Sequence, residues 1–452
     1  MRKLFILLLL AFSLTSCSLK LFEITKEEKY EYNLDIDSLH KNGPLVTHAM
    51  PSIGNVKCLV IPINFESRNK LYSVDKNIEN AFNGKNDTIK YESVSSYYEK
   101  SSNKLLNLEF TILDWYTPNY NSSYYENYSK KQDSGVDLLV DEALSYFDDK
   151  IDYSSFDSDS DGYIDGLWLL YNKEAQRESD FWWAYTSLSD GTKKFDGKKT
   201  FGVSFASTSF MNNEASYYVD ASTYIHETGH LLGLDDYYSY NPTTSGGLYG
   251  ADMMDGNLGD HSSLSKILLG WVKPTIVEKS GDYTLNPFSK EDGSGNVLLV
   301  SNHQISTIYD EYILIDYFTP EGLNKNQGLF LTKLNQSTSG IRAYYANATI
   351  NFDSNGYPTM TDDTYYQSGF KYNNSNQFRK MLKLLGANVD ETIYGLGSNR
   401  LANADFLYTE KNLELGVDVW SDLTYADSSR LNFTMKVNSL GDVANITINL
   451  EG

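Results

Sequence analysis

Hydrophobic and polar positions follow different patterns on the two sides of residue 274. Before it, helix and strand patterns are mixed. The clearest helix is predicted over 136–147, where apolar residues recur at the i, i+3, i+4, i+7 spacing of one helix face. Asp133 or Ser134 can cap this helix, because both side chains accept hydrogen bonds from free amide groups. The apolar face comprises Val136, Leu139, Val140, Ala143, Leu144 and Phe147.

Other segments before residue 274 also have a recognisable period. The apolar, β-branched stretch 56–65 predicts a first buried strand, and the alternating stretch 106–112 predicts a half-buried strand. The segment 164–171 predicts another strand, and 91–102 is compatible with a helix. The mixture predicts a domain that combines a sheet with helices.

After residue 274 a period of two dominates, which is typical of antiparallel strands. We therefore predict an α+β fold, with a mixed sheet-and-helix domain at 54–274 and a mostly antiparallel β domain at 275–452. One stretch, 377–386, is compatible with a helix. The alternating runs lie at 311–318, 328–334, 431–437 and 445–450.

The N-terminus predicts export. Two basic residues precede an apolar run that is too short to span a bilayer, so 1–16 has the layout of a signal peptide. The sequence LTSC at its end resembles the lipobox of bacterial lipoproteins, which implies acylation of Cys17. Ordinary cleavage or an incidental cysteine are the alternatives. With lipidation, 17–53 is a tether or short pro-segment, and the protein is anchored by lipid to the outer face of a membrane.

The charge limits the classes of partner that are expected, and the cysteine content limits the disulfides that can form. The formal charge is −22, and an acidic surface repels phosphate backbones, so nucleic acid is not expected as a partner. Solubility alone explains the charge equally well. Cys58 is the second of only two cysteines, which leaves no disulfide framework if Cys17 is acylated. Its apolar surroundings favour a buried core thiol over a reactive one.

The stretch HETGHLLGLDDYY at 226–238 predicts a metal site. Positions i and i+4 share a helix face, so His226 and His230 can bind one ion about 2 Å away. Glu227 can reach a bound water without being a ligand. Gly233 can turn the chain back, and Asp236 three positions later is the expected third ligand. Three protein ligands leave one position open, as in catalytic zinc sites.

This stretch resembles HExxHxxGxxD, the metzincin motif with aspartate as third ligand, and more closely the immune inhibitor A family of secreted bacterial metallopeptidases. The resemblance implies a metzincin-like peptidase domain, Zn²⁺ on His226, His230 and Asp236, and Glu227 as catalytic base. GLYGADMMDG at 247–256 resembles the family's methionine turn, with Met254 beneath the metal, and 261–274 resembles its closing segment. Asp235 and Ser239 depart from the family pattern, outside the inferred ligands.

An aspartate-rich loop precedes the strand at 164–171. Asp157, Asp159, Asp161 and Asp165 follow the first nine positions of an EF-hand loop, with Gly162 at the turn. The Tyr163 carbonyl can join them as a ligand. Position twelve is Trp168 in place of glutamate, so some ligand must come from elsewhere, and structural Ca²⁺ is favoured over calcium sensing. A solvated acidic turn is the alternative.

The sequence thus predicts a zinc metalloendopeptidase that acts on extracellular proteins or peptides, as a monomer. The alternative is a surface-exposed binding lipoprotein for a glycan or host protein, with a structural metal and no hydrolysis. The candidates for a second oxyanion donor, which could not be ranked, are Tyr238, Tyr249 and His261. Two histidines of the N-terminal segment, His40 and His48, can reach the metal in a latent form, although solvent-exposed histidines explain them better.

Overall fold

The computed structural model describes most of the chain from His48 to Glu451. It leaves out 1–47, 66–73, 85–88, 90, 131–133, 178–179, 212–217, 242–245, 249, 258, 291–292, 294, 304, 306, 326–338, 351–370, 377–378, 388–406, 411–412 and 452. The predicted signal peptide, Cys17 and His40 therefore lie outside the described residues, as does the strand predicted at 328–334. Within the described part, no helix is long and apolar enough to cross a membrane.

The part of the chain before residue 274 is built on a five-stranded sheet with the order β2-β1-β4-β7-β5. Four strands are parallel, and the edge strand β5 runs antiparallel to β7. The strands are β1 (Gly54–Ile63), β2 (Leu106–Ile112), β4 (Leu167–Tyr171), β5 (Tyr185–Leu188) and β7 (Gly202–Ser207), and the short β3 (Tyr163–Ile164) pairs with β6 (Lys199–Thr200) outside this sheet. The helices are α3 (Val74–Asn83), α4 (Val94–Ser101), α5 (Ser122–Ser129), α6 (Gly135–Phe147) and α7 (Ser222–Leu231).

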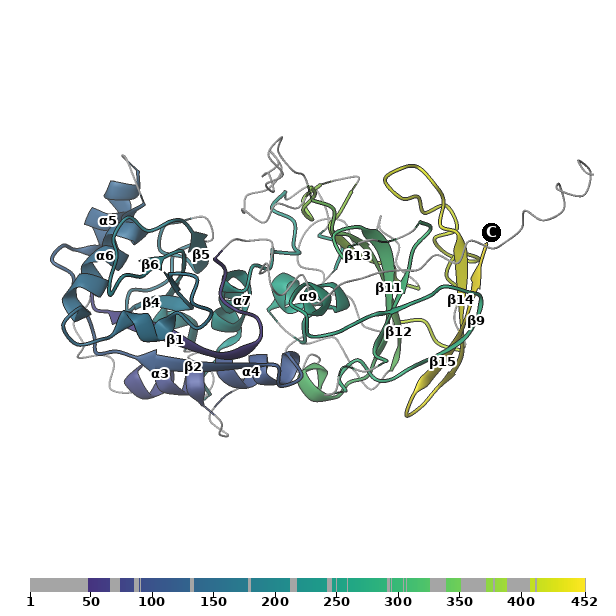
Figure 1. Cartoon of the computed structure of the whole chain (residues 1–452), viewed down its shortest axis with the longest axis horizontal. Helices are drawn as coiled ribbons and strands as arrows, with labels where there is room; N and C mark the ends of the chain where they lie inside the picture. The colour runs from purple at the N-terminus through teal and green to yellow at the C-terminus, as the bar shows by residue number, and fades with distance from the viewer. Residues whose placement is uncertain are drawn as a thin grey trace, which may run out of the picture.

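Helices cover both faces of this sheet (Figure 1). Alternate residues of β1 belong to different hydrophobic clusters, Leu59 and Ile61 with α6, and Cys58 and Val60 with α3, α4 and α7. Burial on both faces explains why the second half of β1 is continuously apolar, as is usual in parallel sheets. The predicted core thiol Cys58 is fully buried in it.

Most predictions for this part are confirmed. Helix α6 buries the predicted face, and the Ser134 hydroxyl accepts a hydrogen bond from the Asp137 amide at its N-terminus. Strand β2 alternates as expected. The helix predicted at 91–102 is the shorter α4, which begins after a capping box at Ser93. The strand predicted at 164–171 is split, because Gly166 turns with a φ of 54° between β3 and β4.

After residue 274, two further sheets pack against each other. One has the order β13-β12-β11-β10-β8 and is antiparallel except for the β10–β8 pair; the other, β14-β15-β9, is antiparallel throughout. The strands are β8 (Thr275–Ile276), β9 (Gly281–Leu285), β10 (Val297–Val300), β11 (Glu311–Phe318), β12 (Gly340–Asn347), β13 (Leu382–Leu384), β14 (Phe433–Leu440) and β15 (Ala444–Leu450). The chain is thus a mixed α/β structure with several sheets, including an antiparallel C-terminal sheet.

Two expectations for this part need correction. The run 311–318 alternates between faces as predicted, but all eight residues of β11 are buried because both faces of its sheet are covered. The helix considered for 377–386 is not formed in the described residues of this stretch. Residues 382–384 form strand β13, which pairs with β12 and buries Leu382 and Leu384. Tertiary pairing here overrides the local helix pattern.

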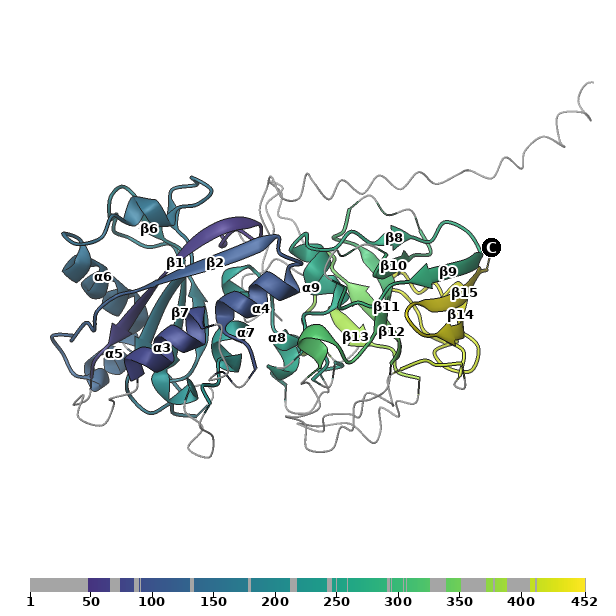
Figure 2. The same cartoon turned by 90° about the horizontal axis from the view of Figure 1, so that it is seen from below.

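The two halves share one core. Helix α9 (Ser263–Leu268) lies between the first sheet and β11 in both views (Figures 1 and 2), and α8 (Met253–Gly256) lies beside it in Figure 2. One hydrophobic cluster combines Ile225 and Met254 with Leu314, Tyr344 and Leu384. The Ser263 hydroxyl on α9 donates to the Asp316 carboxylate of β11, which also pairs with Arg342 Nε at 2.7 Å. The predicted boundary at 274/275 therefore runs through a continuous core.

Candidate metal centre

Helix α7 carries His226, Glu227 and His230 through the interior of the protein. It contacts β5 and β7 on one side and α4 and α8 on the other. Just before the helix, the Asp220 carboxylate accepts a hydrogen bond from the Ser222 amide at 3.0 Å. All three side chains are buried, with exposures of 4, 6 and 4%.

The chain reverses directly after this helix. Gly233 has a φ of 93°, a conformation that favours glycine, and its amide donates to the His230 carbonyl at 2.9 Å. The Leu234 amide donates to the Gly229 carbonyl at 3.0 Å. This turn brings Asp236 back to the Nε2 atoms of the two imidazoles, as the spacing predicts.

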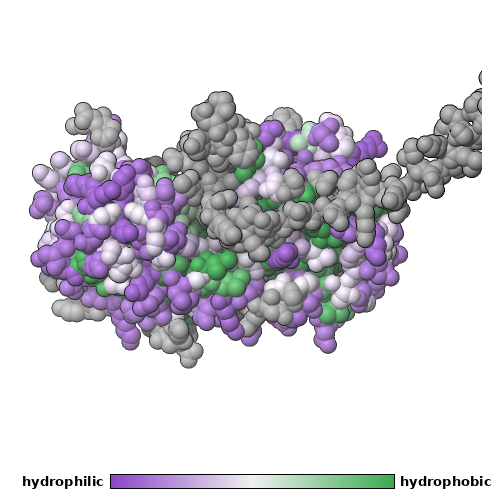
Figure 3. Space-filling model, in the orientation of Figure 1, coloured by the Kyte–Doolittle hydropathy of each residue, from purple (hydrophilic) through white to green (hydrophobic). Residues whose placement is uncertain are grey.

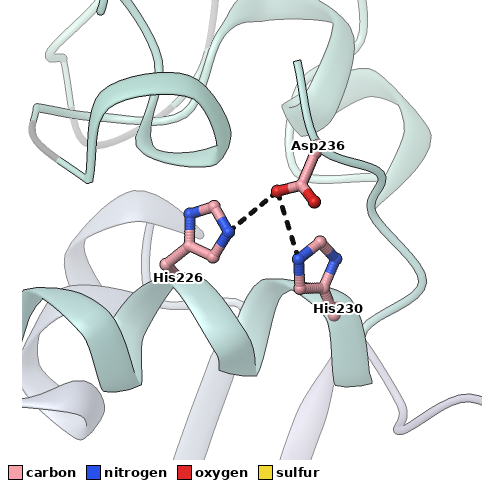
Figure 4. Close-up of side chains that lie close together, drawn as sticks. All are labelled: His226, His230 and Asp236. Carbon is pink, nitrogen blue, oxygen red and sulfur yellow. Dashed lines mark ion pairs between the residues drawn. The ribbon is translucent and has the colours of Figure 1, made fainter. Parts of the chain in front are cut away.

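His226, His230 and Asp236 form a group that can hold a metal ion, because their ligand atoms all lie within 4.8 Å of one another. Asp236 Oδ1 lies 2.9 Å from His226 Nε2 and 3.3 Å from His230 Nε2 (Figure 4). His226 Nδ1 lies 3.0 Å from the Met253 carbonyl, and His230 Nδ1 lies 2.7 Å from the Leu234 carbonyl. Because a carbonyl oxygen only accepts, both Nδ1 atoms carry protons, and both Nε2 atoms face Asp236 Oδ1.

Charge and hydrogen bonding at this group suit a cation. Asp236 Oδ1 is buried and faces the two imidazole Nε2 atoms. Burial opposes ionisation of Asp236, but His230 and His226 hold the pKa of this carboxyl far below its usual range. Burial lowers the pKa of His230, but the Asp236 carboxylate outweighs it and raises this pKa to about 10. The negative charge of Asp236 thus favours a cation at the place that both imidazoles face.

Glu227 lies beside the ligands and outside their group. Thr186 Oγ1 of β5 lies 3.2 Å from Glu227 Oε2 and 3.0 Å from the Glu227 carbonyl, and it is also 2.8 Å from Ser204 Oγ of β7. Burial raises the pKa of the Glu227 carboxyl, although His226 and His230 oppose the shift. The sheet therefore orients Glu227 through a hydroxyl that no motif in the sequence indicates.

Met254, predicted beneath the metal, packs against helix α7. A Cβ atom on Gly229 would lie 2.5 Å from Met254 Sδ, so only glycine fits there without a shift. The Asp252 carboxylate accepts a hydrogen bond from the Met254 amide at 2.6 Å, and the Met254 carbonyl accepts one from the Tyr237 amide at 2.9 Å. The segment 252–254 and the segment after Asp236 are thereby tied together.

The aspartate loop brings together three of its predicted ligands. Asp157, Asp159 and Asp161 form a second group that can hold an ion, and Gly162 takes the expected positive φ of 97°. The buried Asp165 carboxylate instead accepts a hydrogen bond from the Ser158 amide at 2.6 Å. The Tyr163 amide donates to Asp161 at 2.9 Å, and Trp168 is buried in the core.

Two basic side chains contact the same loop. Lys198 Nζ lies 2.5 Å from Asp157 Oδ2. His48 Nδ1 lies 2.6 Å from Asp161 Oδ2, and its ring stacks on Tyr163 with 3.9 Å between centroids. His48 is therefore bound at the aspartate loop, which does not support the latency role considered for it.

The three candidate oxyanion donors differ in position. The Tyr238 ring is parallel to the His226 ring, with 6.3 Å between centroids. His261 is fully buried, with its Nδ1 atom 3.9 Å from Asp252 and its ring against Tyr98 and Trp271, so it has a packing role. Tyr249 lies outside the described residues.

No protein-family model matches this chain, and no curated protein is significantly similar to it.

One residue in direct contact with Asp236 was not predicted from the sequence. The Tyr240 hydroxyl donates a hydrogen bond to Asp236 Oδ2. Tyr240 is four positions after Asp236, but this segment is not helical, so no periodicity indicated the contact.

Proposed function

We propose that this chain is a zinc-dependent endopeptidase with a metzincin-like catalytic part related to the immune inhibitor A family. The observation that carries the proposal is the buried convergence of His226, His230 and Asp236 with Glu227 on the same helix. Two imidazoles and one carboxylate match the donor set of catalytic zinc sites, which keep one position open. A structural zinc site closes with a fourth protein ligand, and no fourth ligand joins this group among the described residues.

In the proposed peptide hydrolysis, the ion and the protein side chains have separate roles. When bound, zinc lowers the pKa of water and polarises the peptide carbonyl. Glu227 accepts the proton of the attacking water and returns it to the departing amine. Thr186 fixes the Glu227 carboxylate through Oε2, which leaves the other oxygen to take the proton. The carbonyls of Met253 and Leu234 hold the imidazoles in the tautomer that ligation requires.

The remaining features fit an exported enzyme. We propose that Cys17 is lipidated and tethers the protein to the outer face of the membrane, and that the aspartate loop binds a structural Ca²⁺ ion. On the face drawn in Figure 3 the described surface is mostly hydrophilic, with a hydrophobic area near the middle of the view. The substrate class is proteins and peptides outside the cell.

Comparison of wild type with Glu227→Gln tests the proposal. Residues 18–452 are incubated with casein, with and without a chelator, and zinc is measured on the same samples. We expect cleavage that the chelator abolishes, and a loss of about 10²- to 10⁴-fold in rate for Glu227→Gln with zinc retained. Glu126→Gln on α5 is the matched control and should cleave as wild type does. Bound zinc without hydrolysis of any protein would favour the binding lipoprotein instead.

A further inference from the structure

The contact between Tyr240 and Asp236 gives the third ligand a defined orientation. Asp236 Oδ1 faces both Nε2 atoms, whereas Oδ2 accepts the hydroxyl of Tyr240. Tyr240 is half-buried and lies beyond the positions that carry the family resemblance. We propose that Tyr240 is a positioning residue that restricts Asp236 to ligation through Oδ1. This inference rests on the metal site of the proposed function.

The physical reason lies in the two oxygens of a carboxylate. An aspartate with both oxygens free can bind an ion through both, and the second oxygen then occupies a further coordination position. A hydrogen bond from Tyr240 engages one lone pair of Oδ2 and competes with the ion for this oxygen. The position that a water molecule needs for hydrolysis therefore stays open. Hydrogen bonds of this kind around ligands commonly change metal affinity by 10- to 100-fold.

The C-terminal part of the chain holds Tyr240 in place. The Tyr240 amide donates to Ser375 Oγ at 2.8 Å. The fully buried Asn374 amide group donates to the carbonyls of Tyr237 and Gly246, each at 2.8 Å. Its oxygen accepts from the Leu382 amide at 3.0 Å, at the start of β13. The segment after the third ligand is thus fastened at both ends to residues more than 130 positions away.

Tyr240→Phe is the direct test, because it removes only the hydroxyl. Zinc affinity is measured by competition with a chromogenic chelator, and coordination by the visible absorption of the Co²⁺-substituted protein. We expect the zinc dissociation constant to rise tenfold or more. We also expect the cobalt absorption to weaken, since Co²⁺ absorbs less strongly as its coordination number rises above four. Ser375→Ala should change both in the same direction and by less. Tyr120→Phe, at an exposed tyrosine, should change neither.

The outcomes separate this inference from the proposed function. If wild type binds zinc and cleaves casein while Tyr240→Phe keeps its affinity and cobalt spectrum, the positioning role is wrong and the enzyme remains. A lower melting temperature with unchanged affinity and spectrum would show a purely structural tyrosine and would also overturn the inference. If wild type binds neither Zn²⁺ nor Co²⁺, both proposals fail.

Discussion

Asp235 and Asp236 are neighbours in sequence and are both buried, yet only Asp236 belongs to the group that can hold an ion. Asp236→Ala removes the carboxylate that both imidazoles face, so we expect metal content after dialysis to fall close to zero. Asp235→Ala should largely keep the metal. Metal analysis by mass spectrometry on both purified variants checks the prediction. Equal retention by the two variants would contradict the assignment of the third ligand.

The Cys58 thiol offers a second test at the scale of one residue. Burial and the nearby Asp165 charge raise its pKa well above the usual range, so the thiol stays protonated at neutral pH. It is also fully inaccessible. In residues 18–452, where Cys58 is the only cysteine, we expect maleimide to react only after denaturation. Mass spectrometry before and after adding denaturant measures this, and rapid labelling of the native protein would contradict it.

The residues of the metal group could be predicted because their spacing is local. His226, His230 and Asp236 are joined by one helix turn and one glycine turn, and both geometries follow from the sequence itself. Thr186 and Tyr240 could not be found in this way. Thr186 reaches Glu227 only because strand β5 pairs next to β7, and Tyr240 reaches Asp236 only because Ser375 and Asn374 shape the intervening loop.

At the scale of elements, we predict that Ca²⁺ binding to the aspartate loop stabilises the folded protein. Burial raises the pKa of Asp159, and the negative charge of Asp161 raises it further. The second cause shows that the carboxylates of the loop repel one another. Calcium at about 100 times its dissociation constant should stabilise the fold by about 2.7 kcal/mol. Thermal unfolding with and without Ca²⁺ measures the increment. Asp159→Asn should abolish most of it.

The control for the aspartate loop is a carboxylate outside it. Asp149 is exposed in the turn after α6, so Asp149→Asn should keep the full calcium increment. A melting temperature that Ca²⁺ does not raise in wild type would identify the loop as a solvated acidic turn, held together by Lys198 and His48.

Elements were predictable where neighbours in sequence decide them. Helix α6 and strand β2 each have one apolar and one polar face, so their periods are visible in the sequence. The alternation of strand β11 could be predicted, but the burial of its second face could not, because nothing in the local sequence shows that this face is also covered. Strand β13 has a helix-compatible composition, and pairing with β12 decided its conformation.

At the scale of the whole molecule, the shared core predicts that the two parts do not separate. The cluster that contains Ile225 and Met254 also contains Leu314, Tyr344 and Leu384. Residues 18–274 alone would expose this apolar surface and leave Ser263 without Asp316. We expect that fragment to bind a hydrophobic dye and to be digested far faster than residues 18–452. A cooperative melting curve at the full-length temperature would contradict this expectation.

The sequence by itself determined what depends on near neighbours: the grouping of His226, His230 and Asp236, the glycine turn, the aspartate loop, helix α6 and the change to β structure after residue 274. Periodicity and turn chemistry encode these features directly. Only the tertiary structure decided the order of the sheets, the burial of both faces of β11, the position of His48 and the contact of Tyr240 with Asp236. Each of these joins residues through packing of the whole chain, for which a linear pattern carries no signal.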